Sequence, residues 1–221
     1  MDAKLIAVFN QKGGCAKTMT TMQLGGALGL RGIRTLVVDM DRQGTSSLWS
    51  AQADSESPFP ATVISLAPMK EKMIGEILKL KNEYDVILID CPPAIESSIP
   101  WSALLSADIA LIPVIPVMDN VWASKEAKEL AKNAKRQNPD LQTFYVASMM
   151  RRGNLFKACM DLLENDEDVE MLKSSLSLRN AFPESQLYGG TVHLFSKNSP
   201  ATEEVEALAD EVLEKLGMEV A

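Results

Sequence analysis

The sequence lacks several features that would place it in common protein classes. It has only three cysteines, whose spacing fits neither a disulfide framework nor a metal site, which indicates a reducing cytosol. Its formal net charge of −8 excludes a globally basic nucleic-acid coat, although a local basic patch stays compatible with it. The longest apolar run, 109–118, is too short to span a bilayer and contains two prolines. Residues 1–4 carry no signal peptide pattern, so we expect a cytoplasmic protein.

Composition and apolar patterning predict one α/β domain covering residues 1–221. Hydrophobic residues make up 46% of the 221 positions, which is enough for a substantial core. Continuous apolar runs are typical of buried parallel strands, and helical patterns lie between them. The predicted strands are 5–10, 35–39, 61–66, 86–90, 109–117 and 142–149. The predicted helices are 18–31, 46–53, 70–81, 119–137 and one that starts at Ser199-Pro200. This alternation predicts a mostly parallel twisted sheet with helices on both faces.

Smaller features give further expectations about packing. The glycines at 25, 26 and 29 lie inside the first predicted helix and suggest close packing of that helix on the sheet. Asp119 is expected to cap the helix 119–137, and Trp122 is expected to pack against the protein, with a dimer surface as the alternative. The last helix has one apolar and one acidic face, which argues against membrane binding.

A glycine-containing loop joins the first apolar strand to the first helix, and this order of elements predicts a phosphate-binding loop. Successive backbone N–H groups in such a loop, together with the helix N-terminus, attract phosphate oxygens. Within it, Lys17 can reach the outer phosphates, and the hydroxyl of Thr18 can bind magnesium. The loop departs from the common P-loop pattern, because a second lysine stands at Lys12 and alanine replaces glycine at Ala16. The predicted nucleotide-binding residues here are Lys12, Gly13, Gly14, Cys15, Ala16, Lys17, Thr18 and Met19.

Two further predicted strands end in aspartate. The strand 35–39 ends at Asp39 and is followed by Asp41, while the strand 86–90 ends at Asp90. Acids at the carboxyl ends of parallel strands lie where open α/β sheets bind ligands. Asp90 is therefore predicted to hold magnesium beside the loop, through water. For Asp39 and Asp41 the alternative is a helix cap or an acidic turn.

These motifs resemble the ParA/MinD family of ATPases. The loop K-G-G-x-x-K-T is similar to the deviant Walker A loop of that family, and 39–45 resembles its D-x-D-P-Q-G switch, with Arg42 in place of proline. Residues 90–93 resemble the second switch, D-x-P-P. The resemblance implies a P-loop NTPase fold in which Lys12 reaches the partner's nucleotide and Asp41 positions the attacking water. It implies that the catalytic residues are Lys12, Lys17 and Asp41, and that Thr18, Asp90 and, in the outer shell, Asp39 serve the metal.

The late part of the chain supplies weaker site predictions. The resemblance places adenine contacts at Met150 and Arg151, where the strand 142–149 ends. A credible basic surface for DNA consists of Arg151, Arg152, Lys157, Lys173, Arg179 and Lys197. It is interrupted by the acidic run 164–170, and an ordinary solvated surface is the alternative.

The resemblance covers essentially the whole chain and is to the small ParA-type partition ATPases that lack an N-terminal DNA-binding domain. It implies an ATP hydrolase with ATP and Mg²⁺ as cofactors, and an ATP-dependent homodimer, with higher polymers left open. The implied partners are non-specific DNA and a centromere-binding, ParB-type protein that stimulates hydrolysis; no membrane is implied. Plasmid or chromosome partition is the implied function, with association of the ATP state with the nucleoid.

Four alternatives stay open at this point. The first is a positioning ATPase for a protein cargo. The second is a dethiobiotin-synthetase-like ligase, which needs a polar substrate pocket that the late half of the sequence does not suggest. The third is an electron carrier similar to the nitrogenase iron protein, for which cluster-binding cysteines are missing. The fourth is a redox switch between Cys15 and Cys91, against the simpler interpretation of two small buried residues.

Overall fold

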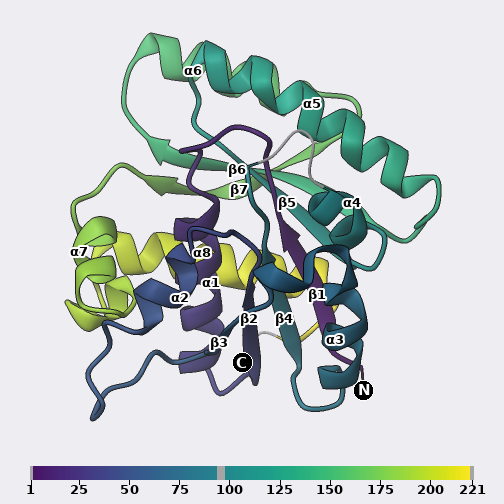
Figure 1. The fold of residues 1–221 in the computed structure, drawn as a ribbon. Helices are drawn as coiled ribbons and strands as arrows, with labels where there is room; N and C mark the ends of the chain where they lie inside the picture. The colour runs from purple at the N-terminus through teal and green to yellow at the C-terminus, as the bar shows by residue number, and fades with distance from the viewer. Residues whose placement is uncertain (1, 94–97, 220–221) are drawn as a thin grey trace.

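The chain forms one parallel sheet with the strand order β3-β2-β4-β1-β5-β6-β7 (Figure 1). This is seen in a computed structural model that describes residues 2–93 and 98–219. Every strand pair in the sheet is parallel. The strands are β1 Lys4–Val8, β2 Thr35–Asp39, β3 Thr62–Ser65, β4 Val86–Asp90, β5 Ile109–Val114, β6 Gln142–Met150 and β7 Glu170–Ser177. The predicted fold class is confirmed.

Helices cover both faces of the sheet (Figure 1). The α-helices are α1 Lys17–Leu30, α2 Thr45–Ser50, α3 Met73–Leu80, α4 Ser98–Leu104, α5 Met118–Lys135, α6 Asn154–Glu164, α7 Ala181–Leu187 and α8 Pro200–Lys215. Two 3₁₀ helices, η1 Ala67–Lys72 and η2 Val192–Leu194, lie between them. Helices α3, α4, α5 and α6 pack on one face, and α1, α2, α7 and α8 pack on the other.

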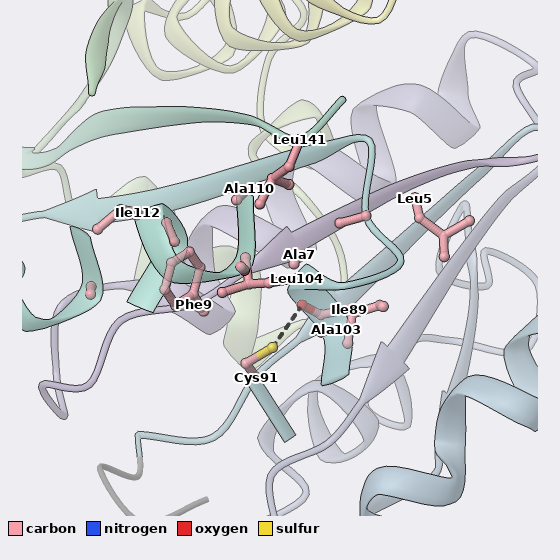
Figure 2. Close-up of a cluster of buried hydrophobic side chains, with 14 of the residues drawn as sticks. Leu5, Ala7, Phe9, Ile89, Cys91, Ala103, Leu104, Ala110, Ile112 and Leu141 are labelled. Carbon is pink, nitrogen blue, oxygen red and sulfur yellow. Dashed lines mark hydrogen bonds between the residues drawn. The ribbon is translucent and has the colours of Figure 1, made fainter. Parts of the chain in front are cut away.

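Successive residues of each strand point to opposite faces, so one continuous apolar run supplies two cores. In β1 and just after it, Ala7 and Phe9 join the core under α3 to α6, whereas Ile6 and Val8 join the core under α1 and α8. Figure 2 shows part of the first core, in which the thiol of Cys91 donates to the carbonyl oxygen of Ile89. The long apolar runs of the sequence are therefore explained by burial on both sides.

Helix α1 packs closely because of its three glycines, but not only on the sheet. A Cβ at Gly25 would lie 2.8 Å from Val37 of β2, as expected for packing on the strands. A Cβ at Gly29 would instead lie 2.2 Å from the carbonyl oxygen of Pro60, and one at Gly26 would lie 2.2 Å from Thr191. The sequence-based interpretation is thus right for Gly25 and wrong for the other two, which face connecting segments.

Several predicted boundaries are wrong. The predicted strand 109–117 ends at Val114. The predicted helix 70–81 is divided, because η1 ends at Lys72 and α3 begins at Met73, and Lys70 inside η1 has a non-helical φ of 51°. Helix α5 has Val117 as its N-cap, so Asp119 lies in the first turn and is not the cap. Trp122 does not pack against the protein as predicted, since it is 57% exposed. By contrast, Ser199 caps α8 as predicted, because its Oγ accepts from the N–H of Thr202 at 3.1 Å.

Helices α4 and α6 and strand β7 are absent from the sequence-based prediction. Strand β7 mixes polar and apolar residues at the edge of the sheet, so it has no continuous apolar run. The acidic run before it is partly neutralised, since Lys128 of α5 lies 2.8 Å from Asp166 and Lys132 lies 2.9 Å from Asp168. No helix within residues 2–93 and 98–219 is long and apolar enough to cross a membrane.

The parallel arrangement brings the carboxyl ends of all strands to one edge. In the register, Val8 of β1 pairs with Asp90 of β4, and Asp39 of β2 also pairs with Asp90. The loop after β1 and the two aspartates therefore lie side by side, as the sequence predicts for a ligand site.

Candidate functional site

The loop between β1 and α1 is held in place by Asn10. Its side-chain amide donates to the carbonyl oxygen of Pro113 in β5 at 2.9 Å, and its Oδ1 accepts from the N–H of Lys12 at 3.1 Å. Asn10 is only 2% exposed. Sequence reasoning missed this residue, although a polar side chain that directly follows a buried strand is a usable signal.

The loop itself is shaped by left-handed backbone conformations. Gly14 has a φ of 74° and Ala16 has a φ of 72°, and Ala16 is the N-cap of α1. Alternation into this conformation turns successive N–H groups toward one side, which is the geometry of an anion-binding nest. Gly13 and Gly14 have open space where a Cβ would be. Ala16 occupies the position where the common P-loop has glycine, and it adopts the conformation that favours glycine.

The two lysines of the loop differ in their surroundings. Lys17 is 6% exposed, and its Nζ donates to the carbonyl oxygen of Lys12 at 3.0 Å, so it lies across the inside of the loop. The thiol of Cys15 donates to the same carbonyl at 3.1 Å. Lys12 is half-buried, and its ammonium group has no hydrogen bond or ion pair with any residue in the described part of the chain.

Asp90 lies at the centre of the site. Its Oδ2 accepts from the hydroxyl of Thr18 at 2.8 Å and from that of Ser46 at 2.7 Å. Its Oδ1 is buried and has no hydrogen-bond partner among the described residues. Burial raises the pKa of Asp90 to about 6, and the nearby charge of Asp39 also raises it, while the two hydroxyls and Lys17 lower it.

A buried carboxylate oxygen without a partner is unfavourable unless a cation or an ordered water binds it. The Oδ1 of Asp90 therefore needs a cation or a water, and the residues around it fit Mg²⁺. Mg²⁺ is commonly held by one or two protein oxygens together with phosphate oxygens and water. Asp90 and Thr18 offer such oxygens at the N-terminus of α1.

Asp39 and Asp41 organise the segment after β2. Both carboxylate oxygens of Asp39 are used, because Oδ1 accepts from the N–H of Asp41 and Oδ2 accepts from both the N–H and the hydroxyl of Ser47. Asp39 thus anchors the start of α2. Asp41 is half-buried, and its Oδ1 accepts from the N–H of Gln43 at 2.9 Å.

Helix α2 carries two residues that sequence reasoning missed, Ser46 and Ser47, which bind the two aspartates. The helix is fixed further by Trp49, whose indole N–H donates to the carbonyl oxygen of Gly190 at 2.9 Å. Serines are frequent in loops and short helices, so nothing in the sequence distinguishes these two from others.

The end of β6 lies next to the segment that follows β7. The N–H of Leu178 donates to the carbonyl oxygen of Met150 at 2.9 Å, and Met149 has a positive φ of 52°. A hollow of about 460 Å³ is lined by Leu178, Arg179, Asn180, Ala181, Ser199, Pro200 and Ala201. Met150 is half-buried and Arg151 is exposed. Neither Met150 nor Arg151 lines this hollow, so the adenine contacts at these two residues stay a prediction.

The residues predicted to bind DNA are exposed, with one exception. Arg151, Arg152, Lys157, Lys173 and Lys197 are exposed. The guanidinium of Arg179 instead pairs with Glu204 of α8 at 2.7 Å, and this pair raises the pKa of Arg179. Part of the predicted positive surface is therefore already neutralised.

The cysteines of the described residues are free and buried. Burial raises the pKa of both the Cys15 and the Cys91 thiol, which disfavours the reactive thiolate form. This agrees with the interpretation of two small buried residues.

Comparison with known proteins finds relatives with different named roles. The chain is 27% identical over 213 residues to the maintenance of carboxysome distribution protein A of Halothiobacillus neapolitanus, covering 94% of this chain and 95% of that one. It is 35% identical over 147 residues to the sporulation initiation inhibitor protein Soj of Bacillus subtilis, covering 50% of this chain and 58% of Soj.

Solved structures give the same fold. A Cyanothece McdA variant in complex with ATP has a TM-score of 0.77 at 15% identity, covering 100% of this chain and 98% of that one. MinD of Pyrococcus horikoshii complexed with Mg-ADP has a TM-score of 0.75 at 23% identity, covering 97% and 98%. The model of the CobQ/CobB/MinD/ParA nucleotide binding domain matches residues 6–192. Since that match spans most of the chain and includes the loop and both aspartate-ended strands, the chain belongs to the CobQ/CobB/MinD/ParA nucleotide-binding domain family.

Proposed function

We propose that this chain is a Mg²⁺-dependent ATPase that works as a dimerising switch. The observation that carries the proposal is the buried, unpartnered Oδ1 of Asp90 beside Thr18, next to the loop that also holds Lys17. Within residues 2–93 and 98–219, nothing forms a hydrogen bond to this oxygen. A carboxylate in this state suits a bound cation, and a loop of inward N–H groups suits phosphate.

In the proposed reaction, water attacks the γ-phosphorus of ATP while the bond to the β–γ bridging oxygen breaks. Lys17 lies inside the loop, where its charge can offset the charge that develops on the phosphoryl oxygens. Asp41 orients the attacking water, and Thr18 and Asp90 hold Mg²⁺, with Asp39 supporting the segment around them. When bound, Mg²⁺ neutralises phosphate charge. The phosphates lie along Lys12 to Met19, and the adenine lies near Met150 and Arg151.

The dimer part of the proposal rests on Lys12. Its ammonium group has no partner among the described residues, although it stands at the start of the loop. A half-buried cation without a partner is consistent with a ligand or a second subunit that supplies the negative charge. We propose that ATP bound to one subunit is contacted by Lys12 of the partner subunit, so that dimerisation requires ATP.

We propose that the ATP-bound dimer binds non-specific DNA through Arg151, Arg152, Lys157, Lys173 and Lys197, with a smaller role for Arg179 because of its pair with Glu204. A centromere-binding, ParB-type protein would then stimulate hydrolysis, and the ATP state would associate with the nucleoid. Partition of a plasmid or chromosome is the proposed outcome.

A second candidate function is the positioning of a protein cargo. It is favoured by the similarity to a carboxysome distribution protein over 94% of this chain. Both proposed functions use the same nucleotide cycle, and the partner protein selects the cargo.

The test is binding to random-sequence DNA with ATP, with ADP and without nucleotide, at low and high salt. It compares the wild type with Lys12→Ala, with an Arg151/Arg152 double alanine variant and with Lys72→Ala, an exposed lysine far from the loop in sequence. Light scattering of the same samples reports dimerisation. ATP-dependent, salt-sensitive binding that Lys12→Ala abolishes and Lys72→Ala retains supports the proposal.

Other outcomes separate its parts. A protein that binds no ATP refutes the nucleotide proposal. ATP-dependent dimers that bind no DNA refute the DNA surface and favour cargo positioning on another surface. DNA binding that the Arg151/Arg152 variant retains in full, or that salt does not weaken, refutes the proposed patch.

A further inference from the structure

The segment after β2 contains a residue that the proposed ATPase cycle leaves unused. Arg42 stands where the D-x-D-P-Q-G pattern has proline. It occupies the second position of a turn closed by a hydrogen bond of 3.0 Å from the N–H of Gly44 to the carbonyl oxygen of Asp41. Proline is favoured at this turn position, so the backbone does not require arginine. The side chain of Arg42 therefore needs another explanation.

Arg42 lines a hollow that is also lined by Asp41, the residue proposed to orient the attacking water. The hollow measures about 760 Å³ and lies beyond the carboxyl ends of β2 and β4, between Asp41 on one side and Pro92 and Pro93 on the other. Lys70 of η1 lines it as well, and both cations also line a neighbouring hollow of about 350 Å³. Two positive side chains thus line the same hollows as Asp41.

The acidic side chains that line this hollow have hydrogen-bond partners, whereas the basic ones do not have any among the described residues. The acids already have partners, because Glu71 accepts from the hydroxyl of Ser98 at 3.1 Å and Asp41 accepts from the N–H of Gln43. Arg42 and Lys70 are exposed, and their side chains have no hydrogen bond or ion pair to any residue that the structure describes.

The backbone of Lys70 supports a functional role. Its φ of 51° and ψ of −133° lie outside the helical region in the middle of η1. Non-glycine residues in rarely populated conformations concentrate at ligand clamps and switch segments. This conformation belongs to the residue that lines the hollow together with Arg42.

We propose that Arg42 and Lys70 form an oxyanion site that receives the phosphate ion released from ATP. This inference rests on the proposed hydrolysis: water and ATP give ADP, phosphate and a proton, with the new P–O bond formed from water and the old one broken toward ADP. A guanidinium group binds two phosphate oxygens at once, and the lysine adds a second positive charge for a dianion. Asp41 and Glu71 lower the affinity of the site, which suits a product that must leave.

The test measures binding of inorganic phosphate to the Mg-ADP-loaded protein by isothermal titration calorimetry at low salt. It compares the wild type with Arg42→Gln, Lys70→Gln and Lys72→Gln, the last being an exposed lysine two residues away that lines neither hollow. Loss of one charge-assisted contact should weaken phosphate binding about fivefold or more, while Lys72→Gln should stay within about twofold. Arg42→Pro, which suits the turn, should fold normally and match Arg42→Gln.

The result that overturns the inference is equal phosphate affinity in the wild type and in both single variants, or no phosphate binding at all. A parallel titration with succinate tests whether the site prefers a dicarboxylate to phosphate. If succinate binds more tightly than phosphate at the same residues, the proposal is overturned in favour of a carboxylate ligand. The nucleotide proposal is judged separately: if the wild type binds and hydrolyses Mg-ATP, only the phosphate site has failed.

Discussion

Replacing Asp90 with asparagine should stabilise the metal-free protein while abolishing its Mg²⁺-dependent nucleotide binding. The pKa of Asp90 is raised from 3.8 to about 6, so the folded state holds this proton more tightly than the unfolded state does. The stability linked to protonation is therefore present below pH 3.8 and is lost as the pH rises through 6. At about 1.4 kcal/mol per pKa unit, ionisation at pH 7 costs about 3 kcal/mol of unfolding free energy.

An asparagine side chain at this position cannot ionise, so the Asp90→Asn variant avoids this cost. The hydroxyls of Thr18 and Ser46 can each accept or donate, and they can pair with the new amide. With a chelator present, urea unfolding at pH 7 should show the variant more stable by up to about 3 kcal/mol, with the difference shrinking as the pH falls toward about 4.

Asp85 provides a control, because its pKa is shifted in the opposite direction to that of Asp90. Hydrogen bonds and the charge of Arg34 lower its pKa, so its contribution is present at neutral pH and is lost in acid. Asp85→Asn should therefore destabilise the protein at pH 7 and have little effect at low pH. Equal stability of the wild type and Asp90→Asn at pH 7 would refute the reasoning, as would a stabilisation that does not change with pH.

Four further substitutions test the backbone, the packing and one charged side-chain contact. Ala16→Gly should raise the unfolding free energy by about 1 kcal/mol, because glycine adopts the φ of 72° without steric cost; an unchanged melting temperature would argue against strain. Gly29→Ala should lower the unfolding free energy by about 1–3 kcal/mol, because its Cβ would lie 2.2 Å from a backbone oxygen. Gly75→Ala, in open space on α3, should raise it by about 0.5–1 kcal/mol, and similar effects of the two substitutions would contradict the packing argument. Glu211→Gln should lower the unfolding free energy at neutral pH, since Glu211 accepts from the N–H groups of Lys173 and Ser174. Against the effect of burial, these hydrogen bonds lower the pKa of Glu211, so the loss of stability should fade in acid, and a loss that does not change with pH would contradict this reasoning.

The parts of the fold that could be predicted are those whose signal is local in sequence. Strands β1, β2, β4 and β5 are buried on both faces, so each appears as an unbroken apolar run. The loop around Lys17 can be identified from the sequence because its glycines and lysines lie next to one another. Asp90 can be identified because it directly ends an apolar strand.

The parts that could not be predicted depend on contacts between distant segments. Asn10 acts through Pro113, and Ser46 acts through Asp90 on another strand, so neither role is visible in the residues around it. Strand β7 lies at the sheet edge, where Glu211 of α8 accepts two of its N–H groups. A strand whose backbone is satisfied by a helix much later in the chain has no need of an apolar run, which is why the sequence pattern does not reveal it.

The unfavourable features of this chain gather at the candidate site. Ala16 takes a left-handed conformation, Lys17 is buried, and Asp90 keeps a buried oxygen without a described partner. Each feature costs free energy in the protein alone, and each becomes favourable when phosphate or a cation is bound. Lys70 and Met149 also have a positive φ away from this loop, so the evidence for where the ligand binds is the coincidence of these three features around Lys17 and Asp90. The same argument explains why the stabilising substitutions expected at Ala16 and Asp90 lie within the site itself.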